Sequence, residues 1–126
     1  MKITGFRPLI ITKDPESVIK TFEDLGFERR HTKKDIEGGA NVGFVMKDAN
    51  DNRVVVASAD NMPQDLTGIS MNVDNFQEAY DFFIGKGFIN PRGEGRVTDT
   101  SSSRATMLVA PSGFAVTIAE HLKNRE

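Results

Sequence analysis

The sequence predicts an α+β fold built from two βαβββ modules, because the same order of elements occurs twice along the chain. Asp14 and Asn75 each stand at a predicted helix start and lie 61 residues apart, as do Gly26 and Gly87, which end the two helices. The apolar closing strands, at 54–57 and 116–119, match at an offset of 62. The offset between matching positions changes by only one residue over about fifty positions, which favours a duplicated module.

The first module is predicted as a strand, a helix and three further strands. Residues 3–12 are β-rich, and Pro8 suits an edge or a non-hydrogen-bonded position. Asp14 as N-cap and Pro15 at the first helical position open the helix. Strands follow at 27–36, 42–47 and 53–58, with turns at 37–39 and 48–52.

The second module repeats this order after a linker. A strand at 67–73 leads to a helix that begins with the capping pair Asn75 and Glu78, and a strand is expected to begin at Phe88. Strands at 104–109 and 114–120 are joined by a turn containing Pro111 and Gly113. We therefore expect a single domain over 1–126, with module one at 1–58, a linker at 59–65, module two at 66–120 and a tail at 121–126.

Composition excludes several classes of function. The 16 basic and 18 acidic residues give a net charge of −2, which is too balanced for a nucleic-acid or anionic-membrane binder. The absence of cysteine excludes disulfides, thiolate metal sites and thiol nucleophiles. No apolar run approaches a membrane span, and residues 1–5 have no signal-peptide core, so we expect a cytoplasmic protein.

The chain resembles the vicinal oxygen chelate superfamily, which includes glyoxalase I, bleomycin-resistance proteins, fosfomycin-resistance enzymes and extradiol dioxygenases. The resemblance covers nearly the whole chain, and it rests on the order and spacing of segments 10–14, 22–27, 87–88 and 111–113. It implies a cupped mixed sheet with the helices on the convex side and a metal or a ligand on the concave side. It also implies a two-fold homodimer.

Enzymes of this superfamily place a His on the first strand of a module, seven residues before the helix cap, and a Glu on the fourth strand. By the resemblance these positions fall on Arg7, Val55, Gly68 and Thr117. Those side chains cannot hold a divalent cation between them, so no metal and no cofactor are expected. The two histidines, His31 and His121, are expected on the surface, and Glu120 on the face opposite Thr117.

Strand alternation extends the candidate site from these positions. It adds Leu9 and Ile11, Ala57, Ser70 and Asn72, and it leaves Arg104 for the concave side if 105, 107 and 109 face the helix. For strand 42–47, either Phe44 with Met46 or Gly43 with Val45 can face the concave side. The predicted ligand-binding residues are Arg7, Leu9, Val55, Ser70, Asn72, Arg104 and Thr117.

The leading hypothesis is a metal-free small-molecule-binding protein of the glyoxalase/bleomycin-resistance type. Small apolar side chains and two arginines suit a ligand with an apolar body and an anionic or carbonyl group. One alternative is a lyase, isomerase or dioxygenase-like enzyme of the same superfamily with atypical or no metal ligands. Another is an interaction module without a pocket, which Phe44 and Met46 on the concave side would favour. No catalytic residue is assigned.

Overall fold

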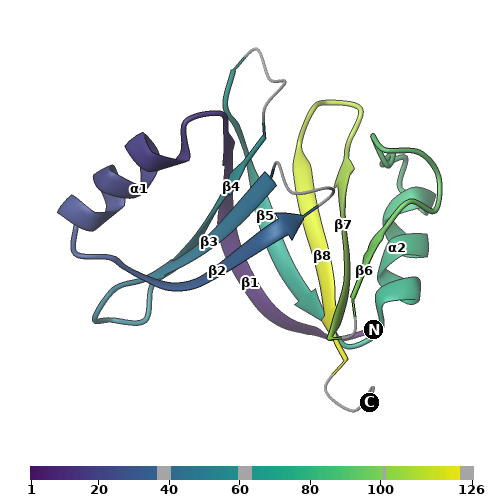
Figure 1. Ribbon diagram of the computed structural model, residues 1–126. Helices are drawn as coiled ribbons and strands as arrows, with labels where there is room; N and C mark the ends of the chain where they lie inside the picture. The colour runs from purple at the N-terminus through teal and green to yellow at the C-terminus, as the bar shows by residue number, and fades with distance from the viewer. Residues whose placement is uncertain (37–40, 60–63, 101, 123–126) are drawn as a thin grey trace. The chain divides into compact units, whose positions relative to one another are not determined.

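The computed structural model describes residues 1–36, 41–59, 64–100 and 102–122, with only the backbone for 31–36, 41 and 42. It divides into two compact units. Figure 1 labels the helices and strands of both. One unit is Arg7–Thr67, and the other combines Met1–Phe6 with Gly68–Glu126. The first strand contributes residues to both units.

The α+β fold predicted from the sequence is confirmed. The strands form an open, mixed sheet with the order β2-β3-β4-β1-β5-β8-β7-β6. In both units the first and last strands of the module pair in parallel, β1 with β4 and β5 with β8, while the other registered pairs are antiparallel. The elements are β1 Ile3–Thr12, α1 Pro15–Asp24, β2 Glu28–Ile36, β3 Asn41–Lys47, β4 Arg53–Ser58, β5 Leu66–Val73, α2 Phe76–Gly85, β6 Thr98–Asp99, β7 Ser103–Val109 and β8 Ala115–His121.

Local signals fix α1 in the Arg7–Thr67 unit as predicted. The Asp14 carboxylate accepts a hydrogen bond from the Ser17 N–H at 3.3 Å, and Gly26 takes a φ of 102° just beyond the helix end. The helix packs on one face of its sheet through a buried cluster that consists of Ile19, Phe44, Met46, Val54 and Val56. The opposite sheet face is therefore the one that α1 does not cover.

Helix α2 covers one face of the other unit. The Asn75 side chain accepts from the Glu78 N–H at 3.0 Å, and the Glu120 carboxylate accepts from the Phe76 N–H at 2.7 Å. The core between α2 and the sheet contains Val73, Phe76, Ala79, Tyr80, Phe83, Leu108, Val116 and Ile118. Glu120 thus lies on the α2 side of its strand, opposite Thr117, as expected.

The prediction of a strand that begins at Phe88 is wrong. Ile89 forms only an isolated bridge with Val109, and the strand at this position in the order, β6, is the two-residue segment Thr98–Asp99. Positive φ angles at Gly93 and Gly95, 117° and 75°, turn the intervening chain away from extended structure. Tyr80 holds this loop, because its hydroxyl accepts a 2.9 Å hydrogen bond from the Gly95 N–H.

The other strand and helix bounds agree with the predictions to within about two residues, the uncertainty expected at element ends. The predicted turn at 37–39, linker residues 60–63 and tail residues 123–126 lie outside the described residues. Among the described helices, none has the length and apolar character needed to cross a membrane.

Candidate functional site

The candidate site in the Arg7–Thr67 unit is the sheet face opposite α1, which we call the distal face of that unit. Leu9 is paired with Val55, and Ile11 with Ala57, in the parallel register of β1 and β4. The alternate residues Ile10 and Val56 pack in the α1 cluster. The predicted facing of Leu9, Ile11, Val55 and Ala57 is therefore confirmed.

The structure also decides the facing of β3, which the sequence left open. Phe44 and Met46 are buried in the α1 cluster. Gly43 and Val45 are paired across the sheet with Ala57 and Val55, so they lie on the distal face. The two large side chains of β3 thus do not occupy this face, which removes the feature that would have favoured an interaction module without a pocket.

Arg7 lies two residues before Leu9 and shares its side of β1, so its guanidinium belongs to the distal face. Its Nε atom is buried and has no hydrogen-bond partner among the described residues. Burial lowers the pKa of the Arg7 guanidinium, and the positive charge of Arg53 lowers it further. Arg7 is thus a partly buried side chain whose Nε lacks a partner among the described residues, and it shares the distal face with Leu9 and Val55.

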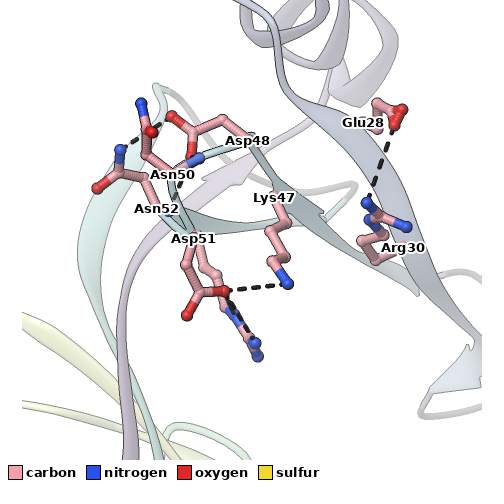
Figure 2. Close-up of polar contacts among 8 residues, drawn as sticks. Glu28, Arg30, Lys47, Asp48, Asn50, Asp51 and Asn52 are labelled. Atoms are coloured by element: carbon pink, nitrogen blue, oxygen red, sulfur yellow. Dashed lines mark hydrogen bonds and ion pairs between the residues drawn. The ribbon is translucent and has the colours of Figure 1, made fainter.

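A cavity of about 270 Å³ opens on the same face and is lined by Arg30, Val45, Lys47 and Arg53. Lys47 and Arg53 are directly paired across the β3–β4 hairpin. Arg30 comes from β2, and Figure 2 labels Arg30 and Lys47. The sequence reasoning missed these three cations, because isolated basic residues in exposed strands are normally solvated. The signal that could have found them is spacing, since Lys47 and Arg53 each stand two residues from a distal valine.

The distal face of the second unit, opposite α2, carries the predicted polar residues of β5 and β8. Ser70 is paired with Thr117, and Asn72 with Ala119, while Ile69 and Met71 pack against the α2 core. Asn72 packs closely on β1, because a Cβ added at Gly5 would lie 3.0 Å from the Asn72 Nδ2 atom. The predicted facing of Ser70, Asn72 and Thr117 is therefore confirmed.

The predicted facing of Arg104 is wrong. Its guanidinium carbon lies 5.0 Å from the centre of the Phe76 ring, and its Nε is 3.7 Å from an Asp99 oxygen. Leu108, on the same side of β7, is fully buried in the α2 core, and Thr106 donates a hydrogen bond to the Arg96 carbonyl. Arg104 faces the helix because an aromatic ring can accept a guanidinium, which a pattern of apolar residues does not reveal.

The metal that the fold implies does not fit the residues present. Arg7 and Val55 offer no lone pair for a cation, and neither does Gly68. At Gly68 no side chain can be added, because a Cβ there would lie 1.9 Å from the Ala115 carbonyl oxygen. Within the described part of the chain, no group of three His, Cys, Asp or Glu residues could hold a metal ion. His121 is exposed as expected, and the side chain of His31 lies outside the described residues.

Comparison with known proteins identifies the fold. No protein-family model matches the chain, and no curated protein matches it. Methylmalonyl-CoA epimerase from Mycobacterium tuberculosis matches with a TM-score of 0.66 at 12% identity, over 94% of this chain and 88% of the epimerase. A glyoxalase/bleomycin resistance protein/dioxygenase superfamily member from Vibrio splendidus 12B01 matches with a TM-score of 0.59 at 14% identity, over 94% and 99% of the two chains.

Glyoxalase I from Zea mays matches with a TM-score of 0.64 at 16% identity, over 94% of this chain. The chain spans 43% of the maize enzyme, so it corresponds to less than half of that protein. With the repeated βαβββ topology, these similarities show that the chain has the vicinal oxygen chelate fold.

Proposed function

We propose that this chain is a metal-free small-molecule-binding protein of the glyoxalase/bleomycin-resistance type, and that Arg7 binds the polar end of its ligand. The observation that carries the proposal is the buried Arg7 Nε, which has no hydrogen-bond partner among the described residues. A buried donor without a partner is unfavourable by about 1–3 kcal/mol. A ligand that supplies an acceptor offsets this cost.

The neighbours of Arg7 define the rest of the ligand. Val45 and Val55 are apolar, partly exposed and lie on the same distal face, whereas Leu9 on that face is already fully buried. A guanidinium beside aliphatic side chains favours a ligand with an apolar body and an anionic or carbonyl group. Ser70, Asn72 and Thr117 remain predicted ligand contacts of the second unit. Arg104 is not proposed as a ligand contact, since its guanidinium contacts the Phe76 ring.

The absence of suitable metal ligands at the four positions implied by the fold supports binding without a metal. Gly68 is the strongest of these observations, because β8 leaves no room for a side chain there. The catalytic activities named for the structural neighbours belong to those proteins. Sequestration of a ligand requires only a pocket with complementary chemistry, so binding is the simplest function that the distal face supports.

The test is to find a ligand and then remove the Arg7 side chain. Small molecules released from the purified chain by denaturation are identified by mass spectrometry, and their binding is measured by calorimetry. The Arg7→Ala variant is expected to bind more weakly by about 1.5–3 kcal/mol, the range for a hydrogen bond to a charged group. It is expected to unfold at the same urea concentration or a slightly higher one, because Arg7 contributes little core packing and the substitution removes a buried donor without a partner.

Arg96→Ala is the matched control, because Arg96 is an exposed arginine of the other unit. It is expected to leave the affinity unchanged. Equal affinities for the wild type and Arg7→Ala, with both proteins folded, would remove the main support for the proposal.

A further inference from the structure

The distal face of the Arg7–Thr67 unit concentrates positive charge around one cavity. Arg30, Lys47 and Arg53 come from three different strands and line the same space of about 270 Å³. Val45 forms the apolar part of the lining. Donors that converge from three strands can contact several oxygens of one anionic group at once.

Two carboxylates partly neutralise these cations. One oxygen of Asp51 lies 3.1 Å from the Lys47 Nζ and 3.2 Å from an Arg53 guanidinium nitrogen. A carboxylate oxygen of Glu28 lies 3.9 Å from a guanidinium nitrogen of Arg30 (Figure 2). Three cations against two carboxylates leave one positive charge at the cavity. The guanidinium of Arg7 adds a second beside the cavity, because the parallel register that pairs Leu9 with Val55 brings Arg7 and Arg53, each two residues earlier on its strand, level with each other.

The hairpin turn holds Asp51 beside the cations before any ligand binds. Asp48 accepts hydrogen bonds from the N–H groups of Asn50 and Asn52 at 2.9 and 2.8 Å, and from the Asn52 side chain at 2.9 Å. Asp51 itself adopts a φ of 68°, the one positive φ at a non-glycine residue in the described segments. The turn thus supplies an internal carboxylate that keeps Lys47 and Arg53 together.

We propose that this cluster of Arg7, Arg30, Lys47 and Arg53 binds a dianionic head group, either a phosphate monoester or a dicarboxylate, on a small molecule with an apolar body. The inference rests on the proposed function and specifies the chemical class of its ligand. The two residual positive charges match a dianion, while the distal aliphatic side chains accept the apolar body. Bound in this way, the dianion competes with the Asp51 carboxylate for Lys47 and Arg53.

The competition gives a distinctive expectation. Arg53→Gln is expected to weaken binding at least tenfold, because it removes a cation from the cavity. Asp51→Asn is expected to tighten binding several-fold, because it removes the competing carboxylate, and asparagine tolerates a positive φ. A merely structural role for Asp51 would produce the opposite change, since the released cations would then be less ordered.

The experiment is calorimetry on the full chain with three probes that share an aromatic body: phenyl phosphate, phthalate and benzoate. The dianions phenyl phosphate and phthalate are expected to bind at least tenfold more tightly than the monoanion benzoate. Whichever of the two binds more tightly identifies the head group as phosphate or dicarboxylate. Binding is also expected to weaken as sodium chloride is raised from about 0.05 to 0.5 M, since charge dominates it.

Control variants separate local from overall charge. Lys20→Gln and Asp24→Asn make the same charge changes on the exposed surface of α1, where Lys20 and Asp24 pair with each other. Both are expected to keep the wild-type affinity within about twofold, as pairs this exposed contribute little. Circular dichroism and urea unfolding confirm that each variant is folded before its affinity is compared.

The inference is overturned if benzoate binds as tightly as both dianions, or if Arg53→Gln binds phenyl phosphate and phthalate as the wild type does. It is also overturned if neither dianion binds. The proposed function fails separately, when Arg7→Ala leaves the affinity for the co-purified ligand unchanged. An uncharged ligand that depends on Arg7 but not on Arg53 would therefore preserve the proposed function and refute the dianion site.

Discussion

Gly68 offers a direct test of how closely β5 and β8 approach each other. The Gly68→Ala substitution adds a Cβ that would lie 1.9 Å from the Ala115 carbonyl oxygen and 2.8 Å from its carbon. Carbon–oxygen contacts between strands normally measure about 3.3–3.6 Å, so the two strands must separate by roughly 1.4 Å or more. The atoms in the way are backbone atoms, which cannot rotate aside as the end of a side chain can.

The loss of stability follows from two terms. Overpacking by one methyl group in a well-packed region costs about 1–3 kcal/mol. Separation of the strands also weakens a ladder hydrogen bond worth about 1 kcal/mol. The free energy of unfolding is therefore expected to fall by about 2–4 kcal/mol, a large share of the roughly 5–15 kcal/mol typical of a domain. At about 2.1 cal/mol/K of unfolding entropy per residue, the melting temperature is expected to fall by about 8–15 °C.

Two other glycines provide matched controls, and urea unfolding followed by circular dichroism measures all three. At Gly5 the added Cβ would lie 3.0 Å from the Asn72 Nδ2, the end of a flexible side chain, so Gly5→Ala is expected to cost less than about 1.5 kcal/mol. At Gly85, the last residue of α2, nothing lies within 4 Å, and Gly85→Ala is expected to be neutral or stabilising by up to about 1 kcal/mol. If Gly68→Ala is as stable as Gly5→Ala, the described approach of β5 and β8 is wrong.

Four further predictions concern stability, acid sensitivity, metal content and assembly. Glu120→Ala is expected to lower the free energy of unfolding by about 1–2 kcal/mol, because it removes the hydrogen bond to the Phe76 N–H, while the exposed Glu94→Ala serves as an unchanged control in urea unfolding. The Asn52 side chain, followed by the Asn52 and Asn50 N–H groups, lowers the pKa of Asp48 below its unfolded value. The stabilisation is therefore present above the unfolded pKa and lost as pH falls through the folded pKa, so melting curves from about pH 5 to pH 2 are expected to show a shallower acid decline for Asp48→Asn than for the wild type. Elemental analysis is expected to find no stoichiometric Zn, Ni, Mn or Fe, and one metal per chain that a chelator removes with loss of stability would contradict this. Light scattering is expected to give about twice the chain mass of 13.9 kDa, and a single-chain mass at micromolar concentration would contradict a homodimer.

Features of the fold that depend on neighbouring residues could be predicted from the sequence. The helix starts at Asp14 and Asn75 and the positive φ angles of Gly26, Gly87 and Gly113 follow from local hydrogen bonding and backbone sterics. The facing of β1 and β5 followed from alternation, once one residue on each strand was placed.

Features that depend on distant partners could not be predicted in the same way. Arg104 faces α2 because Phe76 receives its guanidinium, and the chain after Phe88 forms a loop because Tyr80 holds it from 15 residues away along the sequence. The cation cluster also depends on contacts between distant parts of the sequence. Arg30, Lys47 and Arg53 are dispersed in the sequence and become one group only through the pairing of β2, β3 and β4.

The first strand also has a consequence for the order in which the chain can fold. Residues 1–6 belong to the unit completed by Gly68–Glu126, where Lys2 exchanges hydrogen bonds with Asp74, 72 residues further on. At a synthesis rate of about 5–20 residues per second, this segment waits several seconds on the ribosome for its partner strand. Closing a loop of that length costs about 4 kcal/mol of chain entropy.

The Arg7–Thr67 unit does not depend on residues synthesised after Thr67, because β1 from Arg7 onward pairs with β4 within the unit. That unit can therefore form first, while the segment containing Ile3 and Phe6 stays exposed to other strand edges and to chaperones. The duplicated modules share one topology, yet they can be completed at different times during synthesis, because the unit that contains the second module also includes residues 1–6.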